Sequence, residues 1–153
     1  MKLYFDTCCY SRPYDNPAHQ SQESVEAETI AIEGAVDFCR VLGFSIVGSP
    51  TVVVEIEKIK DDEKRRDVRS FYDRVINEFV DFNDDIFCRA QEIRKQINIK
   101  NYDSFHVAFA EAVSANFLLT TDDRFERAAV KLELKTKVIN PINFLGEFVK
   151  WVQ

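Results

Sequence analysis

The sequence predicts an α/β protein in which a central, mostly parallel sheet is covered by helices on both faces. Two observations carry this prediction. Short apolar runs, each long enough for one buried strand, recur along the chain. The segments between them repeat apolar residues at helical spacing or carry helix-capping residues. Because strands that alternate with helices pair in parallel, the expected architecture is a three-layer α/β/α sandwich.

The predicted strands are short apolar runs that end in polar or turn-forming residues. The first begins directly after Met1 and is followed by Asp6 and Thr7. In chain order the predicted strands are residues 2–5, 44–48, 78–82, 117–119 and 137–139.

The predicted helices follow from periodicity and from capping residues. Residues 25–42 repeat apolar side chains at helical spacing, and Gly43 follows as a C-terminal cap. Ser49 and Pro50 form a favourable N-cap and first-turn pair for a helix that carries Glu55. The remaining predicted helices are residues 63–77, 84–96, 102–115, 124–132 and 141–151.

Length and composition indicate one globular domain spanning residues 1–153. The chain is 46% hydrophobic and 30% charged, which is typical of a folded protein rather than a disordered one. No apolar run approaches the ~20 residues that cross a bilayer, and the N-terminus lacks the pattern of a signal peptide. We therefore expect a cytoplasmic protein without a membrane partner. The four cysteines show no CxxC spacing and are expected to be free thiols.

The net charge of −6 argues against a general nucleic-acid binder, which is usually basic. The basic residues are nevertheless clustered, in residues 58–69 and again in residues 89–100. Such clusters are commonly solvated helical faces. They would also suit phosphate contacts if clustered acids elsewhere account for part of the negative total.

Four carboxylates lie where the predicted strands end or where the following helices begin. Asp6 follows the first strand, Glu55 lies in the helix after the second, Asp103 opens a helix, and Asp122 follows the fourth strand. Ligands of open α/β sheets collect at the carboxyl edge of the strands. Carboxylates gathered there would repel one another unless a cation or a proton relieves them. Hard oxygen ligands favour Mg²⁺ or Mn²⁺, so the sequence predicts a metal site suited to phosphodiester hydrolysis.

At these residues the chain resembles the PIN domain family, and the likeness in order and spacing covers nearly the whole sequence. The segments that carry it are Phe5-Asp6-Thr7, Ser49-Pro50 with Val54-Glu55-Ile56, residues 102–108 (Tyr-Asp-Ser-Phe-His-Val-Ala) and residues 119–125 (Leu-Thr-Thr-Asp-Asp-Arg-Phe). The last two are the more specific. The resemblance implies an α/β/α domain with a central parallel sheet and a Mg²⁺- or Mn²⁺-dependent nuclease, usually acting on RNA. Many members of this size are toxins of toxin–antitoxin pairs, the VapC-like group, and are commonly homodimers.

Carried over by position, the resemblance implies a role for six residues. The family's acidic metal ligands, which are also its catalytic residues, match Asp6, Glu55, Asp103 and Asp122. Thr120 matches a hydroxyl that orients the site, and Thr7 matches the small polar residue after the first acid. Asp123 is one residue too late and serves only as a substitute for Asp122. Cys8 departs from the pattern, because the family often has Asn or Ser there.

Two further residues are candidates for substrate binding or for support of the ligands. His106 lies three residues after Asp103, on the same helix face, where a packed and hydrogen-bonded histidine is more common than a catalytic one. Arg12 could hold a substrate phosphate or could be structural. It begins a segment, residues 11–24, that is expected to be a loop because it contains Pro13 and Pro17.

Together with the clustered carboxylates, the resemblance implies an endoribonuclease that hydrolyses RNA by metal-activated water, with toxin function in a toxin–antitoxin pair and an antitoxin protein as partner. The alternative is a catalytically inactive PIN-like module that binds RNA or a protein. A phosphatase of the haloacid dehalogenase type would need a second Asp two residues after Asp6, where Cys8 stands. A thiol nucleophile at Cys8 lacks a base in the local sequence.

Overall fold

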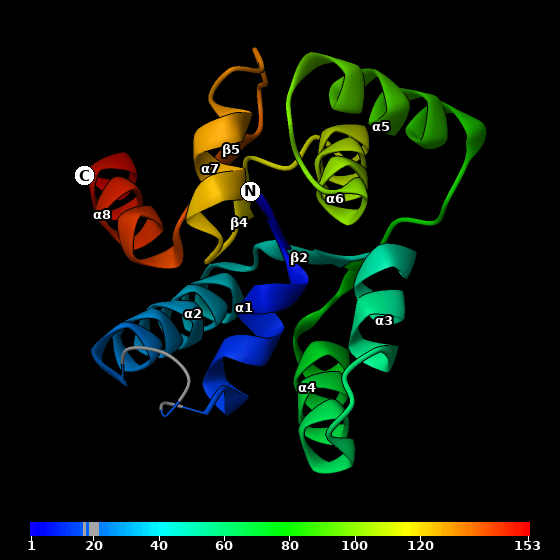
Figure 1. Ribbon diagram of the computed structural model, residues 1–153. Coiled ribbons are helices and arrows are strands. Elements are labelled where there is room, and N and C mark those ends of the chain that lie inside the picture. The colour runs from blue at the N-terminus through cyan, green and yellow to red at the C-terminus, as the bar shows by residue number, and fades with distance from the viewer. Residues whose placement is uncertain (17, 19–21) are drawn as a thin grey trace.

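The computed structural model describes residues 1–16, 18 and 22–153 (Figure 1). Its strands are β1 (Lys2–Phe5), β2 (Ser45–Gly48), β3 (Glu78–Phe79), β4 (Phe117–Leu119) and β5 (Lys137–Ile139). Its helices are α1 (Thr7–Ser11), α2 (Gln22–Leu42), α3 (Pro50–Glu57), α4 (Asp62–Val75), α5 (Asp84–Gln96), α6 (Asn101–Ala112), α7 (Asp123–Ala129) and α8 (Pro141–Val152), with a 3₁₀ turn η1 (Arg12–Tyr14).

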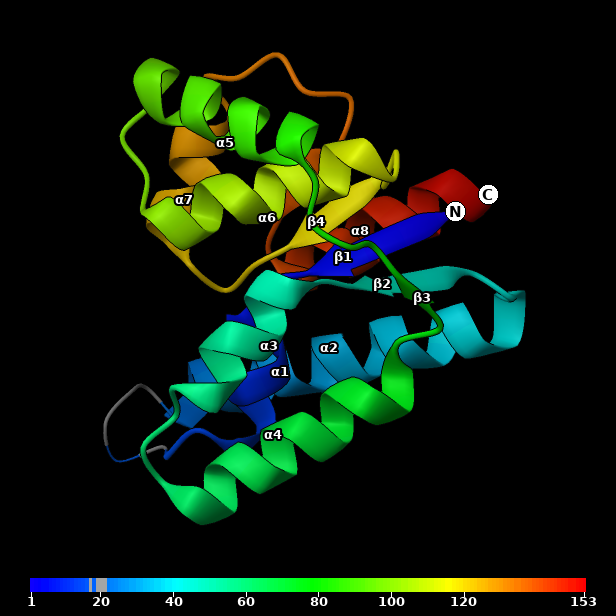
Figure 2. The same cartoon turned by 90° about the vertical axis from the view of Figure 1, so that its right-hand side faces the viewer.

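The five strands form one parallel sheet in the order β3-β2-β1-β4-β5. Leu3 in β1 pairs with Ile46 of β2 on one side and with Phe117 of β4 on the other. The chain proceeds outward from β1 through β2 to β3 and then returns to the opposite side of β1. Helices α5 and α6 lie on one side of the sheet, and α2 and α4 lie on the other (Figure 2). The predicted three-layer α/β/α architecture is confirmed.

The core is centred on β1, which is the middle strand of the sheet and is covered on both faces. Leu3, Tyr4 and Phe5 are fully buried. A strand buried on both faces reads as a continuous apolar run, which explains why this strand was evident in the sequence. The strand order places the point of reversal between β1 and β4. In open α/β sheets the crevice at this point, beyond the carboxyl ends of the strands, is where ligands bind.

Most element boundaries agree with the sequence, and the capping residues account for several of them. The Ser49 hydroxyl accepts a hydrogen bond from the backbone N–H of Val52 at the start of α3, as the Ser-Pro pair predicted. Asn83 and Asn140 cap α5 and α8 in the same way. The predicted strand over residues 78–82 is only two residues long in β3.

The segment after β1 corrects the prediction that residues 11–24 are a loop, and it contains a helix that was not predicted. Residues 7–11 form α1 and residues 12–14 form η1, while α2 already begins at Gln22. Residues 17 and 19–21 of the predicted loop lie outside the described residues. A five-residue helix has no readable periodicity, and this one depends on tertiary packing of its buried Cys9 and Tyr10.

Helix α6 also ends earlier than predicted, at Ala112 rather than at residue 115. Ser114 has a positive φ of 55°, so the chain turns there before it enters β4. None of the helices in the described part of the chain is long and apolar enough to cross a membrane.

Candidate metal centre

Asp6 lies directly beyond β1, at the point where the sheet order reverses. Its backbone N–H donates to the carbonyl of Leu119 at the end of β4 (2.9 Å). Its Oδ2 atom accepts hydrogen bonds from Oγ1 of Thr120 (2.8 Å) and from the thiol of Cys8 (3.2 Å). Because both donors bind Oδ2, the Oδ1 atom faces the other side, where it lies 3.3 Å from Nε2 of His106. The orientation of this buried carboxylate is therefore fixed by its neighbours.

Glu55 reaches the same place from the second turn of α3. Its Oε1 atom accepts hydrogen bonds from Oγ1 of Thr7 (2.8 Å) and from Nε2 of His106 (2.5 Å). Burial alone would raise the pKa of Glu55, but the hydrogen bond and positive charge of His106, with help from Thr7 and Lys100, lower it below its ordinary value. Glu55 is consequently an ionised ligand candidate at neutral pH.

His106 is fully buried and lies between these two carboxylates. Its Nδ1 atom is 2.7 Å from the hydroxyl of Tyr4, which is 2.6 Å from Oγ of Ser49. Burial opposes the charged imidazolium, yet the negative charges of Asp6 and Glu55 outweigh it and raise the pKa of His106. Ligand atoms of Asp6, Glu55 and His106 all lie within 4.8 Å of one another, which is compact enough for one metal ion.

Asp103 lies in the first turn of α6 and is 8% exposed. Burial, followed by the negative charge of Asp6, raises the pKa of Asp103 from 3.8 to about 7. Asp122 and Glu55 add to this effect, while His106 opposes it. The pocket thus contains more carboxyl groups than can all be ionised at neutral pH in the absence of a cation. A divalent cation would compensate this excess of negative charge, so these residues fit such an ion.

Asp122 is the N-cap of α7, and its position differs from that of the other acids. Its Oδ1 atom accepts hydrogen bonds from the backbone N–H groups of Arg124 (3.0 Å) and Phe125 (3.2 Å). Asp103 and Asp122 line one cavity of about 290 Å³. Neither belongs to the compact group formed by Asp6, Glu55 and His106. The four predicted acids therefore gather at one edge of the sheet in two adjoining parts.

The two threonines predicted to support the site both contact its carboxylates. Thr7 donates to Glu55 and Thr120 donates to Asp6, as described above. Thr120 Oγ1 also accepts from the backbone N–H of Asp122 (3.1 Å), so it links the two parts of the site. Cys8 fills a similar position, because its Sγ atom accepts from the N–H of Thr121 (3.3 Å) while its thiol donates to Asp6.

Arg12 is held in ion pairs with other parts of the protein. Its guanidinium lies 3.0 Å from Oδ2 of Asp15 and 3.3 Å from Oε1 of Glu28, and the side chain is largely buried. It lines a separate cavity of about 450 Å³ together with Thr121 and with residues of α2, α7 and α8. These ion pairs with Asp15 and Glu28 support the structural role of Arg12.

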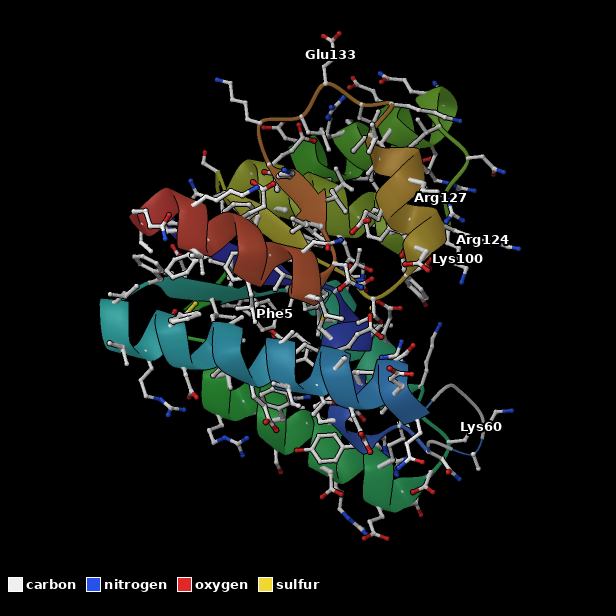
Figure 3. All side chains as sticks on the ribbon, turned by 90° about the vertical axis from the view of Figure 1, so that its left-hand side faces the viewer. Phe5, Lys60, Lys100, Arg124, Arg127 and Glu133 are labelled. Carbon is white, nitrogen blue, oxygen red and sulfur yellow. The ribbon has the colours of Figure 1, made fainter. Side chains whose placement is uncertain are left out.

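Basic side chains border the acidic pocket. Lys100 and Arg124 line the cavity with Asp103 and Asp122, and Figure 3 shows both near Arg127 at one edge of the molecule. Lys58, the C-cap of α3, donates a hydrogen bond to the hydroxyl of Tyr102, the residue before Asp103, and lies 4.7 Å from the centroid of that ring. We refer to Lys58, Lys100 and Arg124 as the basic rim.

Sequence reasoning missed the buried hydrogen-bonded chain of Tyr4 and Ser49 behind His106. A signal for Tyr4 was available, since residues two apart in a strand point to the same face and Tyr4 precedes Asp6 by two. Ser49 was identified only as a helix cap, and the structure gives its hydroxyl this second contact.

A parallel α/β/α sandwich with carboxylates gathered at its switch point is an arrangement found in metal-dependent enzymes that act on phosphate esters. The chain matches the profile of the PIN domain over residues 4–131. It therefore belongs to the PIN domain family, whose members are nucleases that use divalent metals.

The fold is also similar to one chain of a solved structure, the VapBC2 complex from Rickettsia felis bound to a DNA fragment from their promoter. The match covers 92% of this chain and 98% of that chain, with 19% sequence identity and a TM-score of 0.60. At this identity the likeness concerns the fold. The search of curated protein sequences found no match.

Proposed function

We propose that this protein is a divalent-metal-dependent endoribonuclease that hydrolyses RNA phosphodiester bonds, acting as a single domain over residues 1–153. The observation that supports it best is the meeting of Asp6 and Glu55 with His106 inside 4.8 Å, at the edge of the sheet where Asp103 also lies. Residues from three distant parts of the chain contribute. A purely structural role would not require so many carboxylates in one buried pocket.

Asp6, Glu55 and Asp103 are the residues that would hold Mg²⁺ or Mn²⁺. Asp122 has one oxygen committed to capping α7, so it contributes through its other oxygen or through a water molecule. A divalent ion held there supplies Lewis-acid activation of water and neutralises charge that develops on the phosphate. Its charge would also offset the burial and the negative charge of Asp6, which together raise the pKa of Asp103.

The remaining work belongs to the protein's own side chains. Thr120 and Thr7 hold the carboxylates of Asp6 and Glu55 in fixed orientations, so that little reorganisation is required when a substrate arrives. The basic rim supplies cations for the phosphates on either side of the scissile bond. Such a rim reconciles a chain of net charge −6 with an anionic substrate, because the positive charge is local.

The direct test is cleavage of a labelled single-stranded RNA and of the DNA of the same sequence, in EDTA, Mg²⁺ and Mn²⁺. RNA cleavage that requires the metal is expected, and Asp6→Asn and Asp103→Asn should each reduce it by at least about a hundredfold. Asp67→Asn is the matched control, since it makes the same change at an exposed position of α4. Metal binding and RNA binding without cleavage would favour the inactive binding module instead.

Toxin function in a toxin–antitoxin pair is the biological role that we propose for this activity. It is supported by the resemblance to VapC-like toxins and by the fold likeness to a chain of the VapBC2 complex. In that role the protein would be a cytoplasmic homodimer that an antitoxin protein inhibits. Expression of the wild type, but not of Asp6→Asn, should arrest growth, and co-expression of its antitoxin should restore growth. Light scattering of the purified protein tests the dimer.

A further inference from the structure

The placement of His106 resembles that of a ligand more than that of a packing residue. Its Nε2 atom lies 3.3 Å from Oδ1 of Asp6 and 2.5 Å from Oε1 of Glu55. Two neighbouring ligands of an octahedral ion with bonds near 2.1 Å lie roughly 3 Å apart. The imidazole nitrogen therefore lies near a ligand position relative to both carboxylates, and its short contact with Glu55 would lengthen when an ion binds.

The opposite ring nitrogen is held in a way that permits this role. A histidine that binds a metal usually donates its other N–H to a fixed acceptor, which sets its tautomer and orientation. Here Nδ1 is 2.7 Å from the Tyr4 hydroxyl, and that hydroxyl is 2.6 Å from Oγ of Ser49. When Nδ1–H donates to Tyr4, the Tyr4 hydroxyl can donate to Ser49, and Nε2 is left with a lone pair directed between the carboxylates.

The same chain of hydroxyl groups also satisfies the tautomer that suits the metal-free pocket. If Ser49 donates to Tyr4 and Tyr4 donates to Nδ1, then Nε2–H donates to Glu55. Converting the second arrangement into the first requires the ring proton to leave Nε2 and a proton to be taken up at Nδ1, while the two hydroxyl groups rotate; the ring carries the same number of protons in both. The buried position of His106 is thus compatible with both states without an unsatisfied ring nitrogen.

We propose that His106 is a nitrogen ligand of the metal site and makes that site selective for a first-row transition ion, represented by Mn²⁺, over Mg²⁺. This inference rests on the proposed function, because it concerns the same carboxylate site. Mg²⁺ demands oxygen ligands in near-ideal octahedral geometry and loses its waters reluctantly, whereas transition ions accept imidazole readily. A site in which an imidazole joins the carboxylates therefore favours the transition ion.

The test uses Mn²⁺ and Mg²⁺ with the full-length protein and no RNA. In wild type labelled with ¹⁵N-histidine and loaded with Mn²⁺, pulsed electron paramagnetic resonance should detect directly bonded nitrogen. The sequence has two histidines, so His19→Asn is the matched control and should keep the signal, while His106→Asn should remove it. This spectroscopic result requires no cleavage activity.

Calorimetric titration then measures selectivity. The amide of His106→Asn can still meet the Tyr4 hydroxyl but does not reach the carboxylates, so Mn²⁺ affinity should fall about tenfold or more while Mg²⁺ affinity changes far less. His106→Gln brings an amide oxygen toward the position of Nε2 and should keep Mg²⁺ binding while it lowers the preference for Mn²⁺.

The outcomes separate this inference from the proposed function. Absence of nitrogen coupling in Mn²⁺-loaded wild type, or an equal loss of both metals in His106→Asn, overturns the ligand role of His106 and leaves the carboxylate site standing. Failure of the wild type to bind either metal overturns both proposals. Because the spectrum is recorded on wild type, the inference stays testable even if the variants do not fold.

Discussion

Thr120 donates a hydrogen bond of 2.8 Å from its Oγ1 atom to Oδ2 of Asp6, and the two residues are 114 positions apart in the sequence. This bond joins the ends of β4 and β1 at the point where the sheet order reverses. It also determines which oxygen of Asp6 faces Glu55 and His106. The geometry of the candidate metal centre thus depends on a side chain that would not itself bind the ion.

Thr120→Val keeps the shape of the side chain and removes the hydroxyl. We expect metal affinity to fall about 10- to 100-fold, as for other partners that orient ligands, because Asp6 can then rotate. Calorimetric titration with Mn²⁺ measures the loss. Thr136→Val is the matched control: its hydroxyl donates to the carbonyl of Ala115, a hydrogen bond outside the site, and its loss should affect stability while metal affinity is unchanged. Equal metal affinity in Thr120→Val and wild type would contradict this role.

The raised pKa of Asp103 predicts how the stability of the metal-free protein depends on pH. The native state keeps the proton of Asp103 up to about pH 7, whereas the unfolded chain releases it near 3.8. Stability from this group is therefore full below pH 3.8 and is lost as pH rises through 7, by up to about 4 kcal/mol. His106, whose pKa is also raised, acts in the same direction above its unfolded value.

Urea unfolding in EDTA at pH 5, 6, 7 and 8 measures this dependence. Wild type should lose stability across the series, and Asp103→Asn should show a weaker decline because Asn carries no such proton. Excess Mn²⁺ should reverse the trend, since a cation favours the ionised carboxylates. A metal-free wild type that gains stability between pH 5 and pH 8 is the result that this explanation does not allow.

The fold could be predicted because its signals are local. Apolar runs such as Leu3–Phe5 and caps such as Ser49 depend on neighbours in sequence, and they specified most strands and helices correctly. Helix α1 could not be predicted in this way, because its five residues depend on packing by Tyr10 and Cys9 against elements far along the chain. The end of α6 was missed because the turn at Ser114 is set by the entry into β4.

The candidate site was predictable as a set of residues but not as a geometry. Asp6 and Asp122 were identified because they follow the ends of predicted strands, and they lie close together because β1 and β4 are neighbours in the sheet. The sequence carries no signal that His106 lies between Asp6 and Glu55 while Asp103 and Asp122 line the adjoining cavity. That distinction depends on side-chain directions across three separate elements, which spacing along the chain does not encode.

Gly48 at the end of β2 offers a test of packing beneath the site. A Cβ atom added there would lie 2.3 Å from the hydroxyl oxygen of Tyr72 and 2.9 Å from Cδ1 of Ile76, so neighbouring side chains would have to move. Gly48→Ala should therefore lower the free energy of unfolding by about 1–3 kcal/mol.

Gly146→Ala is the contrasting substitution, because a Cβ atom at this helical position would meet nothing within 4 Å. It should stabilise α8 by about 0.5–1 kcal/mol through the higher helix propensity of alanine. Thermal unfolding of both variants measures the difference. A Gly48→Ala protein at least as stable as Gly146→Ala would show that the contacts around Tyr72 are less close than described.

Arg12 provides the last prediction, which separates its two possible roles. Its guanidinium lies 3.3 Å from Oε1 of Glu28, and both side chains are largely buried. Arg12→Met would leave Glu28 and Asp15 without this cation and should cost about 3–5 kcal/mol of stability, as removal of one member of a buried ion pair does. Adding Glu28→Gln should recover part of the loss, because the uncompensated buried charge is then gone.

Arg40→Met is the control for this substitution, since the Arg40–Asp37 pair is exposed (68% for each side chain) and should contribute less than about 1 kcal/mol. Chemical denaturation of the four proteins gives the free energies. If Arg12→Met instead retains full stability and only weakens RNA binding, then Arg12 contacts the substrate as the sequence suggested. A large loss of stability that Glu28→Gln partly restores would instead assign Arg12 to the ion pairs that join η1 to α2. The substrate phosphates would then be contacted by the basic rim of Lys58, Lys100 and Arg124.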